Sequence, residues 1–347
     1  MVFAPPTQRT FRLSLCMALS LAFAYGIAFP LPYLPPIFAL MLTLPPRAPL
    51  GVKKILAVLL LVALTTGCGI LLIPMLNQYS MTGLILIVLG LFLCNFLAVN
   101  LGKGLVAALL TVGLTLVTAA GYSSTALAQL VVQSLMGSIA IAWACQHVAY
   151  FLFPEPVAGP SVAKKKAVPK PSDSQSNWLA WRATLIVFPA YLLALTNPGQ
   201  YLPIIMKSVS LGQQDSVTDA SHAARELLGS TFLAGLFAIL FWFGLGIMVN
   251  LWMFFLWMLL FSLYFASKLY QISPSRYPAS FWVNAAVTML ILLGPAVQDS
   301  ANGNNVYMAF LVRISLFIAV TLYAIFAIYA LERLRAWRGR KAPAKGT

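Results

Sequence analysis

Residues 55–73 read ILAVLLLVALTTGCGILLI, a run without a charged side chain. An α-helix rises about 1.5 Å per residue, so a run of this length spans the ~30 Å apolar core of a bilayer. A membrane β-strand would instead alternate apolar and polar residues over about ten positions. Since the run is apolar at both odd and even positions, it predicts a transmembrane helix.

Comparable runs occur at 84–99, 231–249 and 315–331. The whole chain of 347 residues is 61% hydrophobic and only 8% charged, with a mean hydropathy of +0.89. Soluble domains carry about 25% charged residues, so this chain has too few charges to cover a water-soluble surface. The composition predicts an all-α integral membrane protein with the lipid bilayer as its surroundings.

Apolar length, prolines and polar breaks predict about twelve transmembrane helices in two groups of six. The first group is expected at 12–29, 31–44, 53–74, 82–100, 104–120 and 126–152, and the second at 178–196, 201–211, 229–249, 251–270, 279–296 and 307–331. Residues 153–177, rich in proline and lysine, have the composition of a linker. The expected organisation is a membrane half at 1–152, a cytoplasmic linker at 153–177, a second membrane half at 178–332 and a basic cytoplasmic tail at 333–347.

The two halves share features that suggest an internal repeat. Arg12 and Arg182 each begin a half, and the triplets Tyr33-Leu34-Pro35 and Tyr201-Leu202-Pro203 follow about one membrane crossing later, each in a short segment. Because each half has an even number of helices, the repeats would be parallel, related by an axis along the membrane normal. Chance similarity of apolar stretches is the alternative.

The distribution of lysine and arginine predicts the orientation of the chain. With the N-terminus in the cytoplasm, 21 of the 22 Lys and Arg residues fall on the cytoplasmic side or at the helix ends beside it. Cytoplasmic loops carry such an excess in membrane proteins. We therefore expect both termini in the cytoplasm, and this distribution explains the net charge of +15 without nucleic acid.

Lys207 and Arg313 are the cations expected deepest in the second half. A charge at bilayer depth costs about 2.5–3.5 kcal/mol on insertion scales, so it usually faces a cavity or a partner. Either residue would suit an anionic substrate, although snorkelling to the headgroups is the alternative. The seven Asp and Glu residues all lie outside the centres of the predicted helices, so no buried carboxylate is expected to relay protons.

Short, proline-containing segments at matching places in two halves point to a transport site, because broken helices leave backbone groups that need a cavity or a ligand. A tight helical hairpin is the competing explanation for the first set of prolines. The predicted substrate path comprises Arg12, Tyr33, Pro35, Pro36, Arg182, Tyr201, Pro203, Lys207 and Arg313.

Enzymatic signatures are missing from the sequence. There is no nucleotide-binding P-loop, no serine nucleophile elbow and no zinc-protease motif. The four cysteines have no metal-ligand spacing and are expected to be apolar filling within helices. We predict no enzymatic activity, no metal and no cofactor.

A family resemblance extends over nearly the whole chain. Arg12, followed by a helix rich in small residues and Pro32-Tyr33-Leu34-Pro35-Pro36, resembles the fusaric acid resistance superfamily of bacterial inner-membrane exporters. The second half is similar to the compact branch of that group labelled DUF2955, in the motifs Arg182-Ala183-Thr184-Leu185, Asn197-Pro198, Tyr201-Leu202-Pro203, Met206-Lys207-Ser208 and Leu211-Gly212-Gln213-Gln214.

The resemblance implies an inner-membrane efflux component that exports aromatic or other anionic small molecules with a periplasmic, HlyD-like membrane-fusion adaptor. The chain lacks the large soluble domain that longer exporters carry between their halves, which leaves energy coupling open. A membrane scaffold for an envelope assembly, without transport, is the main alternative, and an intramembrane enzyme acting on lipid is a weaker one. Assembly as a homo-oligomer is left open.

Overall fold

The computed structural model describes residues 4–45, 48–101, 104–154, 173–212, 220–301, 303 and 305–341, and these form helices joined by short connections. The first six helices are α1 (Pro5–Gly26), α2 (Leu34–Thr43), α3 (Val52–Gln78), α4 (Ser80–Leu101), α5 (Gly104–Ser123) and α6 (Thr125–Leu152). The next six are α7 (Asp173–Thr196), α8 (Pro198–Gly212), α9 (Ala220–Ile247), α10 (Leu251–Leu269), α11 (Ala279–Ala301) and α12 (Val306–Lys341).

The predicted number and order of helices are confirmed within the described residues, and the differences are at helix ends. α1 begins at Pro5 rather than near 12, because proline in a first turn lacks only an N–H that would have no partner there. α7 begins at Asp173, so the last residues of the expected linker are helical. α12 continues to Lys341, through residues rich in the good helix formers Arg, Leu and Ala. Most of the expected linker lies outside the described residues.

Eight of the described helices are long and apolar enough to span a membrane. Two others are short: α2 has 10 residues and α8 has 15. At about 1.5 Å per residue they extend roughly 15 and 22 Å, less than the ~30 Å apolar core of a bilayer. The chain therefore has the architecture of a multi-pass helical membrane protein in which two helices are too short to cross the apolar core of the bilayer.

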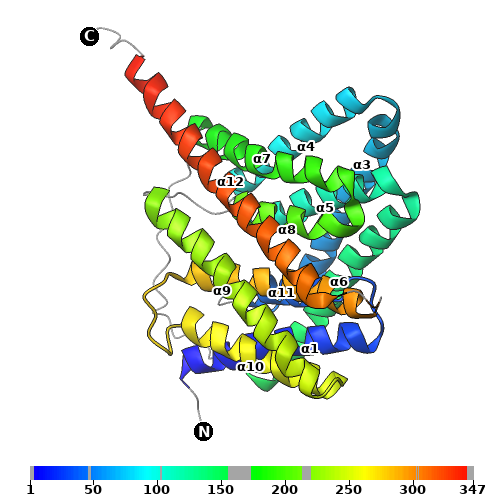
Figure 1. Cartoon of the computed structure of the whole chain (residues 1–347), viewed down its shortest axis with the longest axis vertical. Coiled ribbons are helices and arrows are strands. Elements are labelled where there is room, and N and C mark those ends of the chain that lie inside the picture. The colour runs from blue at the N-terminus through cyan, green and yellow to red at the C-terminus, as the bar shows by residue number, and fades with distance from the viewer. Residues whose placement is uncertain are drawn as a thin grey trace.

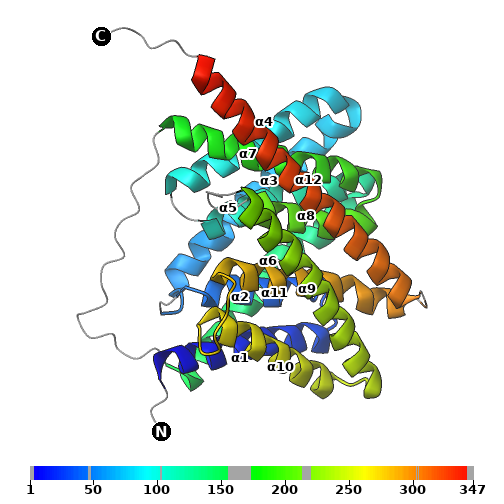
Figure 2. The same ribbon diagram turned by 60° about the vertical axis from the view of Figure 1, so that its left-hand side comes forward.

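The helices run back and forth between two faces of the molecule. The beginning of α1 and the end of α12 lie on the same side, at the left of the view, whereas the turns from α3 to α4 and from α9 to α10 lie at the right (Figure 1). The turned view keeps the end of α9 and the junction of α11 with α12 together on that second side (Figure 2). This alternation is the arrangement expected of successive membrane crossings.

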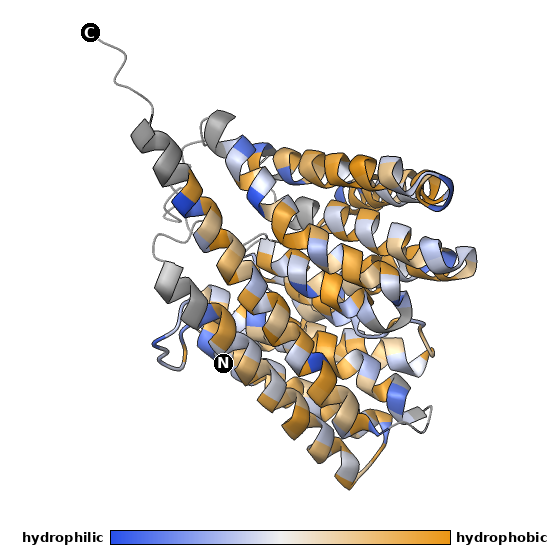
Figure 3. Cartoon of the chain, turned by 45° about the horizontal axis from the view of Figure 1, so that its top comes forward, coloured by the Kyte–Doolittle hydropathy of each residue, from blue (hydrophilic) through white to orange (hydrophobic). Residues whose placement is uncertain are grey.

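Some helices are central, whereas others expose apolar side chains on the surface of the bundle. α1 packs against α2, α6 and α10, and α7 packs against α8, α12 and α4. The most apolar stretch of α11 is 83% buried, whereas that of α3 is 22% buried, and α3 exposes leucine side chains. Apolar residues dominate the helices, and hydrophilic ones gather mostly at loops and helix ends (Figure 3). α11 is thus a central helix and α3 a peripheral one.

Candidate functional site

A small apolar cavity lies where the two short helices meet the central ones. Its wall is built by α2, α5, α8 and α11, two helices from each half, and its volume is about 20 Å³. The wall includes Ile37, Met41, Val112, Met206, Val209 and Val287. This volume is about enough for one water, so the closed structure has no room for a larger molecule.

Lys207 of α8 directly follows Met206, which lines the cavity, and Lys207 is completely buried without being part of the cavity wall. Its Nζ donates to Oδ1 of Asn284 at 3.2 Å and to Oγ1 of Thr288 at 2.7 Å, both on α11. Asn284 and Thr288 are buried as well, and Nδ2 of Asn284 donates to Oγ of Ser230 on α9. The lysine is therefore held by a network of neutral side chains from three helices.

The hydrogen-bond directions in this network are fixed. Thr288 donates its own hydroxyl proton to the carbonyl oxygen of Asn284 at 2.6 Å, so toward Lys207 it acts as an acceptor. Asn284 uses its amide nitrogen on Ser230, so its oxygen faces the lysine. An ammonium group has three N–H donors, and these two acceptors satisfy two of them. One donor of Lys207 has no acceptor among the described residues.

The network and the cavity occupy neighbouring faces of the same two helices. On α11, Val287 lines the cavity and the adjacent Thr288 contacts the lysine. On α8, Met206 lines the cavity and precedes Lys207 directly. Successive residues of a helix are rotated by about 100°, so the ammonium lies to one side of an apolar wall. The arrangement places a cationic donor next to apolar surface.

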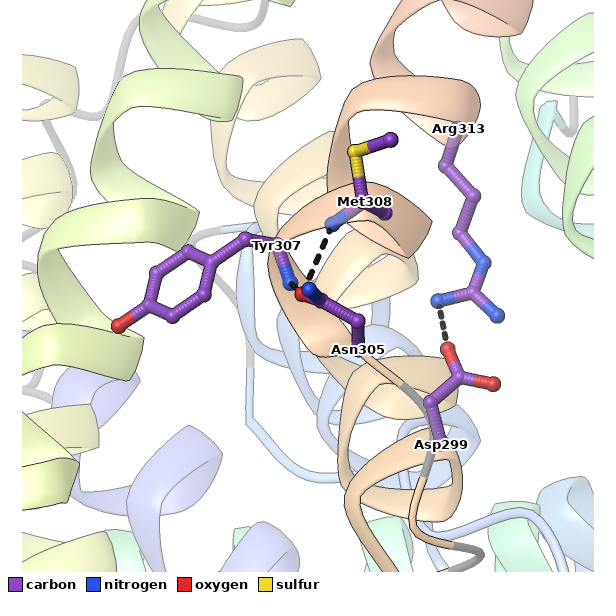
Figure 4. A network of polar contacts seen from close by, with 5 residues as sticks. All are labelled: Asp299, Asn305, Tyr307, Met308 and Arg313. Atoms are coloured by element: carbon purple, nitrogen blue, oxygen red, sulfur yellow. Dashed lines mark hydrogen bonds and ion pairs between the residues drawn. The ribbon is translucent and has the colours of Figure 1, made fainter.

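Arg313 lies elsewhere, at the junction of α11 and α12. Its Nη1 is 2.5 Å from Oδ2 of Asp299, and both side chains are mostly buried (Figure 4). Asn305 begins α12 by accepting the backbone N–H groups of Tyr307 and Met308, which fixes the helix start beside this ion pair. Arg313 is thus paired with a carboxylate in this state.

Tyr33 connects the junction of α11 and α12 to α2. Its side chain is buried, and its ring lies against Gly294 of α11, where an added Cβ would overlap the ring. Gly294 and Asp299 lie on the same helix, so Tyr33 packs near the end of α11 that carries this carboxylate. Tyr33, Arg313 and Asp299 therefore belong to one end of the molecule, on the side opposite the beginning of α1.

Arg12 and Arg182 lie in α1 and α7, the first helix of each group of six. Arg12 of α1 donates to the carbonyl oxygen of Phe153 at 3.4 Å, and its guanidinium lies 3.9 Å above the Tyr150 ring, at the end of α6. Arg182 of α7 lies 3.8 Å from the carboxylate of Glu332 on α12. Each arginine thus contacts the last helix of its own half.

The prolines have two different roles in the short helices. Pro35 and Pro36 fall in the first turn of α2, where a missing N–H costs nothing, so they begin the helix and do not interrupt it. Pro203 lies inside α8, four residues before Lys207, and it leaves one backbone carbonyl of the preceding turn without its helical partner. Tyr201 is partly buried in the first turns of the same helix.

Sequence reasoning missed the polar partners that define the site. Ser230, Asn284, Thr288 and Asp299 were not among the predicted path residues. Asn284 and Thr288 are four positions apart inside an expected helix, so a polar pair on one helix face was visible in the sequence. Nothing in the sequence indicated that this face meets Lys207.

Comparison with known proteins supports part of the predicted resemblance. Residues 9–148 match the model of a family described as a protein of unknown function, DUF2955, from within α1 to within α6. The wider likeness to fusaric acid resistance exporters stays a prediction. No curated protein matches the chain. No solved structure matches it either.

Proposed function

We propose that this chain is the inner-membrane component of a bacterial efflux system and exports small aromatic or other anionic molecules between its two halves. The observation that carries the proposal is the buried Lys207, on the same two helices, α8 and α11, that help to line an apolar cavity to which each half contributes two helices. Lining of this kind, mostly apolar with a few placed polar groups, is typical of small-molecule sites.

The chemistry of the site suits an aromatic carboxylate. The unfilled N–H donor of Lys207 would bind the carboxylate, since charge-assisted hydrogen bonds of this type are stronger than neutral ones. The apolar wall formed by residues such as Met206 and Val287 would contact the ring. No bond of the substrate is broken in this role, so the proposal is a transporter and not an enzyme.

Two parallel six-helix repeats are part of the proposal. They are supported by the packing, because exchanging each helix with the one six positions later maps most contacts onto others: α1 with α10 onto α7 with α4, and α3 with α5 onto α9 with α11. The matching places of Arg12 and Arg182 support the same relation. Related halves with a site between them are a common design among secondary transporters.

The described state is closed, so transport requires the halves to move. The cavity would open toward one face and then toward the other, and Tyr33 with the Arg313–Asp299 pair would close the end away from the termini. That end would face the periplasm and a HlyD-like adaptor. The cytoplasmic placement of both termini is supported by the lysine and arginine distribution.

Transport can be tested by measuring how much of each radiolabelled aromatic carboxylate in a panel accumulates in energised cells with and without the protein. A HlyD-like adaptor is co-expressed. We expect lower accumulation of at least one compound, abolished when an uncoupler dissipates the proton-motive force. Lys207→Met should lose the effect at equal membrane abundance, and Lys53→Met, at an exposed position, should keep it. If the accumulation of every compound is the same with and without the protein, the result supports the scaffold alternative.

A further inference from the structure

We propose that export by this chain is electrogenic: the positive charge of Lys207 makes the empty carrier respond to membrane potential, and a bound monovalent anion cancels that charge. The inference rests on the proposed function and adds its energy source. It starts from the charges that the described helices bury.

Lys207 differs from Arg182 and Arg313 in the kind of partner that it contacts. Arg182 lies beside Glu332 and Arg313 beside Asp299, so each of these arginines has a carboxylate within ion-pair distance. Lys207 has no exposed surface, and its hydrogen-bond partners, Asn284 and Thr288, are neutral. Within the described residues no carboxylate compensates it. A protonated Lys207 therefore leaves the site with a net positive charge.

The network leaves one N–H group of the Lys207 ammonium without an acceptor among the described residues. Thr288 and Asn284 act only as acceptors toward the lysine, for the reasons given by their own donor bonds. They occupy two N–H groups of the ammonium, and the third remains for a ligand. A carboxylate bound there would turn the site from a net charge of +1 into a neutral ion pair in a low-dielectric setting, where an uncompensated charge is costly.

The charge balance of the cycle follows from these two states. The loaded site moves outward as a neutral pair, and the anion leaves on the far side. The empty site returns with its positive charge, which an inside-negative potential pulls toward the cytoplasm. One negative charge leaves the cell in each cycle, and no proton has to be exchanged. For 100 mV the potential would sustain an anion ratio of about 50-fold, from about 2.3 kcal/mol per charge.

The full chain is tested after purification and reconstitution into liposomes, with radiolabelled 4-hydroxybenzoate at pH 7.5 as the probe. Exchange of labelled for unlabelled probe at zero potential measures transport without net charge movement. Net uptake is then measured with potassium gradients and valinomycin that make the lumen positive, negative or neutral. We expect exchange in all cases, and net uptake that rises by tenfold or more with a positive lumen over a negative one.

Variants separate the charge of Lys207 from its packing. Lys207→Arg keeps a cation and should keep the response to potential, whereas Lys207→Met should lose it, and Lys53→Met should behave as the unmodified chain. Should Lys207→Met not fold, the response of the unmodified chain and of Lys207→Arg still decides the question.

The outcomes distinguish the two proposals. Exchange with net uptake indifferent to potential overturns the electrogenic cycle and leaves the transport function standing. Uptake driven by a pH gradient at zero potential, with no response to valinomycin, also overturns it, because the return step would then be neutral. Absence of both exchange and uptake overturns the proposed function and with it this inference.

Discussion

Among single residues, a glycine without a side chain permits one close contact between the halves. Gly294 of α11 has no side chain, and the Tyr33 ring from the other half occupies that space. Gly294 lies on the same helix as Asp299, the partner of Arg313. A glycine within a helix costs about 1 kcal/mol relative to alanine, so its presence here is explained by the ring that it admits.

We expect Gly294→Ala to lower stability, because the new methyl group overlaps the buried Tyr33 ring and overpacking costs about 1–3 kcal/mol. The apparent melting temperature of the purified protein in detergent measures the effect. Gly246→Ala in α9 is the matched control, since no atom lies within 4 Å of its added Cβ, and it should not lower the melting temperature. Equal values for both variants would contradict the close approach of Tyr33 to α11.

Among the helices, α2 and α8 both line the cavity, and α8 carries the buried Lys207. With 10 and 15 residues they are the shortest of the described helices. α8 carries Lys207 inward on one face and lines the cavity on the next. Both short helices therefore contribute to the candidate site: α2 and α8 line the cavity, and α8 also carries Lys207.

Filling the cavity should stop transport while leaving the bundle assembled. In Val209→Phe the larger ring exceeds a cavity of about 20 Å³ and lies between α8 and its neighbours. We expect transport of the carboxylate that responds in the cellular assay to fall about tenfold, with a stability loss of about 1–3 kcal/mol from overpacking. Val148→Phe makes the same change on an exposed part of α6 and should transport normally. Transport by Val209→Phe at the level of Val148→Phe would remove the cavity from the path.

At the scale of the whole molecule, the two faces of the bundle differ in what they present. The beginning of α1 and the end of α12 share one face, and the turns α3–α4 and α9–α10 share the other (Figure 1). The lysine and arginine distribution predicts that nearly all of these residues lie toward the first face. We therefore predict that the first face is the cytoplasmic one.

Reporter fusions test this assignment. Green fluorescent protein at the C-terminus should fluoresce and alkaline phosphatase there should be inactive, because the first face is expected in the cytoplasm. Phosphatase inserted after Tyr79, in the turn between α3 and α4, should be active. An insertion between Met248 and Val249, in the turn between α9 and α10, should give the same result. Activity at the C-terminus, or inactivity at both turns, would contradict the topology.

The sequence alone determined the helical class, the order of the helices and the approximate place of each. These properties are local, since apolar length and proline positions report directly on whether a segment can cross a bilayer. Lys207 was also identifiable from sequence, because a cation within an apolar segment is unusual wherever its partners lie.

The tertiary structure decided what each of these residues meets. Lys207 and Asn284 are 77 positions apart, and neither sequence segment encodes the other. Arg313 is paired with Asp299 in this closed state, and Tyr33 packs against Gly294 of the other half. Such contacts depend on which of the twelve described helices pack against one another, and all of these helices are similarly apolar. That choice is made by side-chain fit between helices, which single-helix patterns do not record.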